Sequence, residues 1–146
     1  MPRSEQPERR ALMIEMPFEV KTYDIDHFGH VNNAVYVRWL EDLRLRFLDV
    51  YFPLQQQLEQ GFAPIIASTE IHYKKGILLF DKPIGRLWIR HLSRAIFTLG
   101  AEITVDGQIA TIATQRGVFA DLEKMKAIRI PKELRERWED AVREGR

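Results

Sequence analysis

The chain has 146 residues, enough for one domain with a core of its own. Apolar residues make up 45% of it and the formal net charge is +1, so nothing indicates a nucleic-acid partner. There is no cysteine, which excludes disulfides, a thiolate nucleophile and thiolate metal ligands. No uncharged apolar run is long enough to span a bilayer, so we expect a cytoplasmic location without membrane insertion.

The first ten residues are polar and mix arginine with glutamate, and we expect residues 1–10 to form a disordered tail. Apolar and polar residues then alternate over residues 12–22, which predicts a half-buried strand. Pro17 lies inside this strand and indicates an edge or a bulge, because proline cannot donate to a ladder. No internal repeat is visible, so residues 11–146 are interpreted as a single domain.

The loop that follows, from Tyr23 to Asn33, carries several groups that can do chemistry. Asn32 or Asn33 is a good N-cap for the next helix, whose first amides have no partner inside it and can donate to an anionic oxygen. Gly29 allows a tight turn, and Asp26 then lies close to this electropositive end. A carboxylate facing free amides is a workable hydrolytic site, although an aspartate before a helix is more often a cap or turn residue.

Two histidines stand beside this aspartate. His27 and His30, together with Asp26, could ligate a metal, but no clear further ligand accompanies them. We therefore expect no metal site and no cofactor.

A long amphipathic helix is predicted from Asn33 to Tyr51. Its first apolar row has the i, i+3, i+4 spacing and comprises Val35, Tyr36, Trp39, Leu40, Leu43, Phe47 and Val50. A second apolar row comprises Ala34, Val37, Leu45 and Leu48. The strip left for solvent consists mainly of Arg38, Asp42, Arg46 and Asp49. Most of the circumference is thus expected to be buried, with other elements wrapped around the helix.

The remainder of the chain predicts a meander of strands. A polar connector with a helical turn is expected over residues 55–61, and a final amphipathic helix begins at Pro131. Alternation or β-rich composition predicts four strands in between, at residues 65–73, 84–92, 95–105 and 108–120. The dipeptide Asp106-Gly107 predicts a tight hairpin between the last two. This order indicates an α+β protein whose sheet curls around one helix.

The loop and helix residues also resemble a known family. The run from Asp26 through Gly29 to Tyr36, followed by Glu41 and Arg44, resembles the D-x-x-G-H-V-N-N-x-x-Y signature of hot-dog-fold acyl-CoA thioesterases of the hydroxybenzoyl-CoA thioesterase type. The likeness covers about residues 12 to 131. It implies a hot-dog fold, with an antiparallel sheet of about five strands wrapped around one long central helix. It also implies edge-to-edge pairing into a homodimer or homotetramer.

The resemblance assigns roles within the motif. It implies that Asp26 is the catalytic carboxylate, as nucleophile or general base, and that the amide of Asn33 takes the thioester oxygen. Gly29 shapes the loop at the substrate, and Tyr36 joins it as a substrate-binding candidate, although it could simply be a core residue. His30 is a supporting catalytic candidate that could equally serve to order the loop.

Binding of the nucleotide end of coenzyme A is less well defined. Candidates are Lys74, Lys75, Arg90 and Arg94, all of which could equally be solvated surface charges. The chain also departs from its relatives, since Ile96 stands where many of them place a hydroxyl that supports the second-subunit part of the site.

These observations predict an acyl-CoA thioesterase that hydrolyses a small or medium acyl-CoA to free acid and coenzyme A. A thiol has a pKa of about 8.5, so the thiolate leaves with little help from a general acid, and one carboxylate with one oxyanion site can suffice. The alternative is a hot-dog protein that binds acyl thioesters without hydrolysing them. The presence of Asp26 is evidence against this alternative. A hot-dog hydratase is a weaker third hypothesis, because the expected Asp and His spacing is missing.

Overall fold

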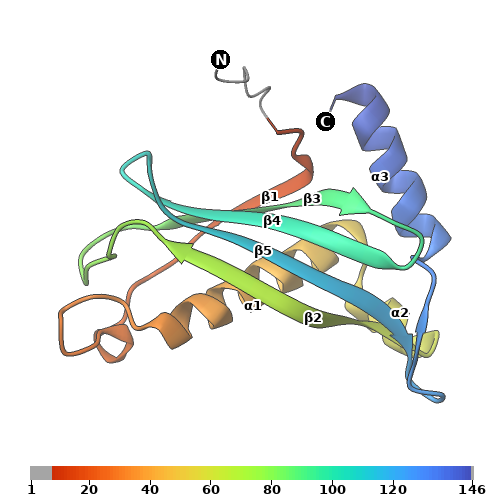
Figure 1. Ribbon diagram of the computed structural model, residues 1–146, viewed down its shortest axis with the longest axis horizontal. Coiled ribbons are helices and arrows are strands. Elements are labelled where there is room, and N and C mark those ends of the chain that lie inside the picture. The colour runs from red at the N-terminus through yellow and green to blue at the C-terminus, as the bar shows by residue number, and fades with distance from the viewer. Residues whose placement is uncertain (1–7, 146) are drawn as a thin grey trace.

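The computed structural model describes residues 8–145 and contains six strands, three α-helices and one short 3-10 helix within that range (Figure 1). In chain order they are β1 (Ala11–Pro17), the 3-10 helix η1 (Thr22–Asp24), α1 (Asn33–Tyr51), α2 (Leu54–Glu59), β2 (Phe62–Tyr73), β3 (Ile84–Leu92), β4 (Ile96–Val105), β5 (Gln108–Asp121), β6 (Lys126–Ile128) and α3 (Lys132–Glu144).

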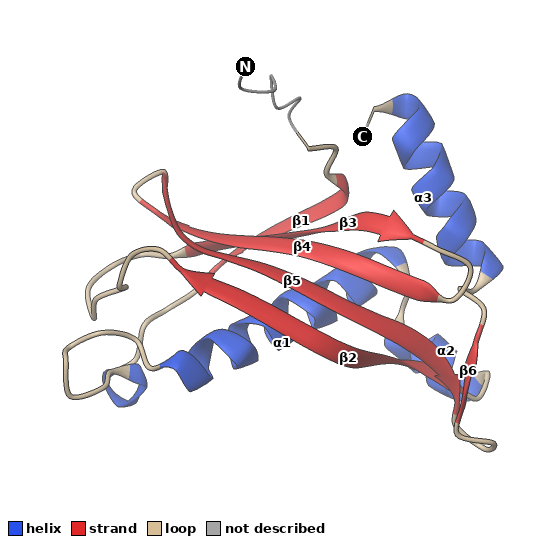
Figure 2. Ribbon diagram, viewed as in Figure 1, coloured by secondary structure: helices blue, strands red, loops and turns tan. Residues whose placement is uncertain are grey.

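The strands form one curved antiparallel sheet in the order β1-β3-β4-β5-β2, with α1 running along one of its faces (Figure 2). Short β6 pairs with the end of β5. The predicted hairpin is confirmed: Val105 pairs with Gln108, and Asp106 and Gly107 between them both have positive φ, 51° and 76°. The predicted α+β hot-dog architecture is confirmed by this curled sheet and its long helix.

The core lies between α1 and the concave face of the sheet. The first predicted row of α1 is buried as far as Phe47, and Leu43 at its centre is 0% exposed. The second row is only partly buried: Val37 and Leu45 are 49% and 43% exposed, whereas Leu48 is buried. The prediction that most of the circumference is buried is therefore wrong for a single chain: the sheet is shallow enough to cover one face of the helix only.

Two strands differ from their predicted forms. β1 ends at Pro17 rather than residue 22, since the Phe18 amide donates to the Pro83 carbonyl at 2.9 Å outside the strand ladder. β2 begins earlier than predicted and contains a register shift between Ile66 and Ser68. This bulge breaks the single alternation expected over residues 65–73, because an extra residue moves the following side chains to the other face.

Most of the predicted tail, residues 1–10, lies outside the described residues, which begin at residue 8. The described part crosses the convex face of the sheet. Arg10 makes a bidentate contact with Glu102, at 2.6 and 3.0 Å, and stacks over the Trp88 ring at 4.1 Å from its centroid. Among residues 8–145 no helix is long and apolar enough to cross a membrane.

Candidate active site

The segment before α1 folds as a narrow hairpin that places Asp26 next to the start of the helix. The Asp26 amide donates to the His30 carbonyl at 2.8 Å, and the Asn32 amide donates to the Asp24 carbonyl at 2.7 Å. The amide of Val31 donates to the Ile77 carbonyl at 2.8 Å, which ties the hairpin to the segment after β2. Gly29 closes its tip with a φ of +81°, a conformation that favours glycine.

One oxygen of the Asp26 carboxylate is held by the loop itself. Oδ1 accepts hydrogen bonds from the amides of Phe28, at 2.9 Å, and His30, at 3.2 Å. Within residues 8–145 the other oxygen, Oδ2, has no hydrogen-bond partner. The loop thus fixes the orientation of the carboxylate through one oxygen and leaves the other for a water molecule or a substrate carbon.

The start of α1 leaves one amide open at the end of the hairpin that carries this carboxylate. Asn32 is the N-cap, and its side chain accepts from the Ala34 amide at 2.9 Å, which decides between the two predicted caps. The Val35 amide donates to the Asn32 carbonyl at 2.9 Å. No hydrogen bond to the Asn33 amide is present in the described part of the chain. This amide lies at the positive end of a 19-residue helix, where it can donate to an oxyanion.

His30, Lys74 and Lys75 lie at the same end of the molecule as Asp26. His30 forms a bridge with Leu78, and its ring packs so closely on Gly76 that a Cβ there would lie 2.9 Å from it. Lys75 is the neighbour of that glycine, and its Nζ donates to Gln108 Oε1 at 3.4 Å. The structure therefore brings these predicted residues next to the hairpin.

Tyr36 lies in the core, 2% exposed, beneath the first turns of α1. Its ring makes edge contacts with Trp39 and Tyr73, with centroids 5.6 and 5.0 Å apart. Burial raises the pKa of its hydroxyl. Its side chain thus supports the helix from below, and a contact with substrate stays a prediction.

Arg90 and Arg94 are not brought to Asp26 within one chain. Arg90 lies on the convex face, where it pairs with Glu8 and donates to Thr114 Oγ1 at 2.7 Å. Arg94 lies in the β3–β4 turn, at the opposite end of the sheet from the Asp26 hairpin (Figure 1). The predicted nucleotide-binding set is therefore divided between three places.

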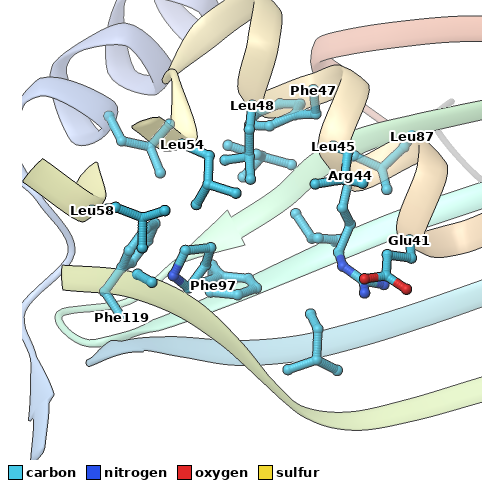
Figure 3. A pocket seen from close by; sticks show the side chains of 16 residues that line it. Glu41, Arg44, Leu45, Phe47, Leu48, Leu54, Leu58, Leu87, Phe97 and Phe119 are labelled. Carbon is cyan, nitrogen blue, oxygen red and sulfur yellow. The ribbon is translucent and has the colours of Figure 1, made fainter. Parts of the chain in front are cut away.

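A second feature of the candidate site, which sequence reasoning missed, is an apolar cavity of about 390 Å³ (Figure 3). It lies between the C-terminal half of α1, α2 and the sheet. Glu41 and Arg44 provide its charged groups, and its other lining residues are Leu45, Phe47, Leu48, Leu54, Leu58, Ala63, Pro64, Ile66, Leu87, Ile89, Phe97, Leu99, Phe119 and Leu134. No sequence signal marks it, because its apolar lining residues have the pattern of ordinary core positions in their own elements.

A chain of polar contacts leads from Arg44, which lines this cavity, to the edge strand β2. Arg44 Nη1 donates to Gln115 Oε1 at 2.8 Å, and Gln115 Nε2 donates to Thr69 Oγ1 at 3.0 Å. Burial lowers the pKa of the Arg44 guanidinium. Glu41 lies beside Arg44 in Figure 3. The cavity is thus apolar except for Glu41 and Arg44, and hydrogen bonds through Gln115 link Arg44 to Thr69 of β2.

Asp26 and the cavity of the same chain are separated by packed side chains. Tyr36, Leu40 and Leu43 fill the space between the N-terminal half of α1 and the sheet, and each is at most 2% exposed. Glu41, where the cavity begins, is eight residues beyond Asn33, or ~12 Å along the helix axis. A ligand in the cavity cannot reach Asp26 of its own chain through the interior.

A curled antiparallel sheet with one long helix along it is the hot-dog fold. In this chain, the loop that leads into the helix carries an aspartate. The comparison with protein families agrees: residues 20–138 match the model of the Thioesterase-like superfamily. This match spans most of the chain, so the protein belongs to that superfamily. The predicted enzyme class, a hydrolase of thioester bonds, is confirmed at this level.

Known proteins resemble the whole domain. The long-chain acyl-CoA thioesterase FadM of Escherichia coli is 28% identical over 132 residues, which are 89% of this chain and 100% of FadM. The structure of the probable thioesterase YbaW from Escherichia coli has a TM-score of 0.79 at 27% identity and covers 88% of this chain and 98% of its own. The structure of a Thermus thermophilus thioesterase complexed with coenzyme A and Zn has a TM-score of 0.77 at 28% identity, and the match covers 93% of this chain and 96% of that chain.

Proposed function

We propose that the protein hydrolyses acyl-CoA to a free acid and coenzyme A, with Asp26 as the catalytic carboxylate. The observation that carries this proposal is that one short hairpin, which leads directly into α1, holds an Asp26 carboxylate with an open Oδ2 and ends at the open amide of Asn33. The similarity to FadM and to a thioesterase that binds coenzyme A supports the choice of thioester.

The chemistry follows from these two groups. Either Asp26 takes a proton from a water molecule whose oxygen attacks the thioester carbon, or its carboxylate attacks that carbon and water opens the resulting anhydride. In both routes the carbonyl oxygen becomes an anion and accepts a hydrogen bond from the Asn33 amide. The C–S bond then breaks, and the thiolate, whose conjugate acid has a pKa of about 8.5, leaves without a general acid.

The acyl group that we propose is an aliphatic chain of medium length. The cavity holds about 390 Å³, which is within the range of ligand pockets. A methylene group is about as large as a water molecule, whose share of liquid volume is ~30 Å³, so roughly thirteen carbons would fill the cavity. The apolar lining favours such a chain over a strongly polar acyl group.

The active unit that we propose is a homodimer or a larger assembly built on it, paired through β2. In the described residues, β2 pairs with β5 on one side and leaves its other edge unpaired. Exposed apolar side chains flank that edge on the strand itself and on α1, namely Val37, Leu45, Ile65 and Tyr73. Antiparallel pairing of two β2 edges about a two-fold axis would bury them and set the Asp26 hairpin of one chain against the cavity end of its partner.

A hydrolysis screen tests the proposal. Saturated acyl-CoA thioesters from acetyl to palmitoyl are offered to the purified protein, and release of free thiol is followed. We expect the highest kcat/KM for medium chains. Binding of acyl-CoA without release of thiol at any length would favour the non-hydrolytic alternative.

A further inference from the structure

Two charged side chains face a cavity that is otherwise apolar. Of the described residues that line it, Glu41 and Arg44 carry a charge and all the others are apolar (Figure 3). The two are three positions apart on α1, so their side chains leave the helix on the same face. A charge beside an apolar cavity costs free energy unless a polar partner offsets it. We call these two residues the Glu41–Arg44 pair.

The Arg44 guanidinium is held in place by a buried amide. Its Nη1 donates to Gln115 Oε1 at 2.8 Å, and Gln115 is 2% exposed. The other end of that amide, Nε2, donates to Thr69 Oγ1 at 3.0 Å. Gln115 is therefore fixed from two sides, and the guanidinium has a defined position in the cavity wall before any ligand binds.

Most donors of this guanidinium have no partner. An arginine has five N–H donors. Within residues 8–145 the guanidinium of Arg44 makes the one hydrogen bond to Gln115 and no ion pair. By contrast, Arg10 and Arg86 on the convex face both pair with glutamates. A tie between α1 and β2 uses one donor, so the others are available to an acceptor inside the cavity.

Glu41 places an acceptor next to these donors. Its charge favours the protonated form of Arg44, in opposition to burial, which lowers the pKa of the guanidinium. Among the described residues, however, its carboxylate accepts no hydrogen bond and forms no ion pair, even with Arg44. The cavity thus offers a donor group and an acceptor group that are not joined to each other.

We propose that the Glu41–Arg44 pair recognises a hydroxyl group on the acyl chain. A hydroxyl accepts from the guanidinium and donates to the carboxylate, so it satisfies both groups. An oxo group can use Arg44 alone, a carboxylate is repelled by Glu41, and a methylene leaves both groups without a partner. The inference rests on the proposed function, because it names the substrate class, a hydroxylated acyl-CoA, for the same cavity.

The pair also selects where the hydroxyl stands along the chain. Every other lining residue is apolar, so a hydroxyl elsewhere in the cavity loses its water without gaining a partner. We therefore expect a gain in kcat/KM when the hydroxyl lies at the Glu41–Arg44 pair and a loss when it lies deeper among the apolar side chains.

Kinetics with a positional series test the assignment. Acyl-CoA thioesters of one chain length carry a hydroxyl that moves one carbon at a time, and the oxo counterparts and the unsubstituted chain complete the series. At the favoured position we expect kcat/KM of the parent to be about tenfold higher for the hydroxylated than for the unsubstituted chain, the effect of a charged hydrogen bond. The oxo compound should lie between them.

Two variants divide this preference between the two residues. Arg44→Met removes the donors, so the advantages of the hydroxyl and of the oxo group over the unsubstituted chain should both disappear. Glu41→Leu removes the acceptor, so the hydroxylated chain should lose its advantage over the oxo chain alone. Each result is a ratio between substrates on one preparation, which is independent of the amount of folded enzyme. The matched control is Arg46→Met on the exposed strip of α1, which should leave all ratios unchanged.

The outcomes separate this inference from the proposed function. No gain at any hydroxyl position would overturn it, even though the parent hydrolyses unsubstituted acyl-CoA. A gain that survives in Arg44→Met would overturn the assignment to this pair. If Arg44→Met does not fold, Glu41→Leu decides, because an unchanged ratio of hydroxylated to oxo substrate would refute the pair. If the parent hydrolyses no thioester, the proposed function fails, and calorimetric titration with the same series decides: equal Kd at every position would refute the inference, and tighter binding at one position, lost in Arg44→Met, would support it.

Discussion

The two ends of α1 have opposite character. At its start a polar hairpin presents an oriented carboxylate, one open amide and a histidine. Toward its other end an apolar cavity of about 390 Å³ lies between the helix and the sheet, with Glu41 and Arg44 as its charged lining residues. The cavity begins at Glu41, ~12 Å along the helix axis from Asn33, and packed side chains fill the interior between the hairpin and the cavity. The hairpin and the cavity of one chain are therefore not connected through its interior.

The largest expected effect separates catalysis from binding. Asp26→Asn removes the negative charge but retains the shape of the side chain, and we expect kcat to fall at least ~100-fold for every acyl length. Ala63→Phe places a ring in the cavity, so we expect it to slow the longest accepted acyl-CoA and to spare the shortest. Steady-state kinetics over a series of chain lengths measures both. A length-dependent loss in Asp26→Asn would show that the carboxylate acts in binding instead.

A second contrast concerns stability along α1. Leu43 is fully buried between the helix and the sheet, and Leu43→Ala is expected to lower the free energy of unfolding by roughly 2 to 5 kcal/mol. Arg46→Ala, on the exposed strip, is expected to change it by less than about 0.5 kcal/mol. Urea denaturation measures both. Equal changes would mean that the face assigned to the core is wrong.

The smallest effect is expected at alkaline pH. Burial raises the pKa of the Tyr36 hydroxyl in the folded state, so the folded protein keeps this proton where the unfolded chain loses it. Stability is then fully present below the unfolded value of about 10 and decreases as the pH rises through the folded pKa. Tyr36→Phe should reduce this alkaline decrease, whereas Tyr23→Phe, at a residue 77% exposed, should leave it unchanged. Denaturation midpoints between pH 8 and 11 provide the measurement.

Local patterns predicted the local structure around Asp26 well. The bounds of α1, a cap at one of two asparagines and the Asp106-Gly107 hairpin all depend on interactions within a few residues. The position of Asp26 in the loop before this helix could be predicted because the loop and the helix are continuous in sequence, whereas its catalytic role stays a prediction.

The cavity end could not be predicted in the same way. Its lining comes from the four strands β2 to β5 and from α1, α2 and α3, so no single stretch of sequence contains its signal. The exposed faces of Val37 and Leu45 were misjudged because periodicity shows that a face is apolar, not which surface covers it.

The central claim, that each active site combines the hairpin of one chain with the cavity of its partner, is tested most directly by mixing two defective variants. Asp26→Asn chains and Ala63→Phe chains are unfolded together, refolded as a mixture and assayed on the longest acyl-CoA that the parent accepts. Half of the dimers are then mixed, and each has one site with an intact aspartate and an intact cavity, so about one quarter of the parental activity should return. Activity no higher than the average of the two separate variants would contradict a site shared between chains.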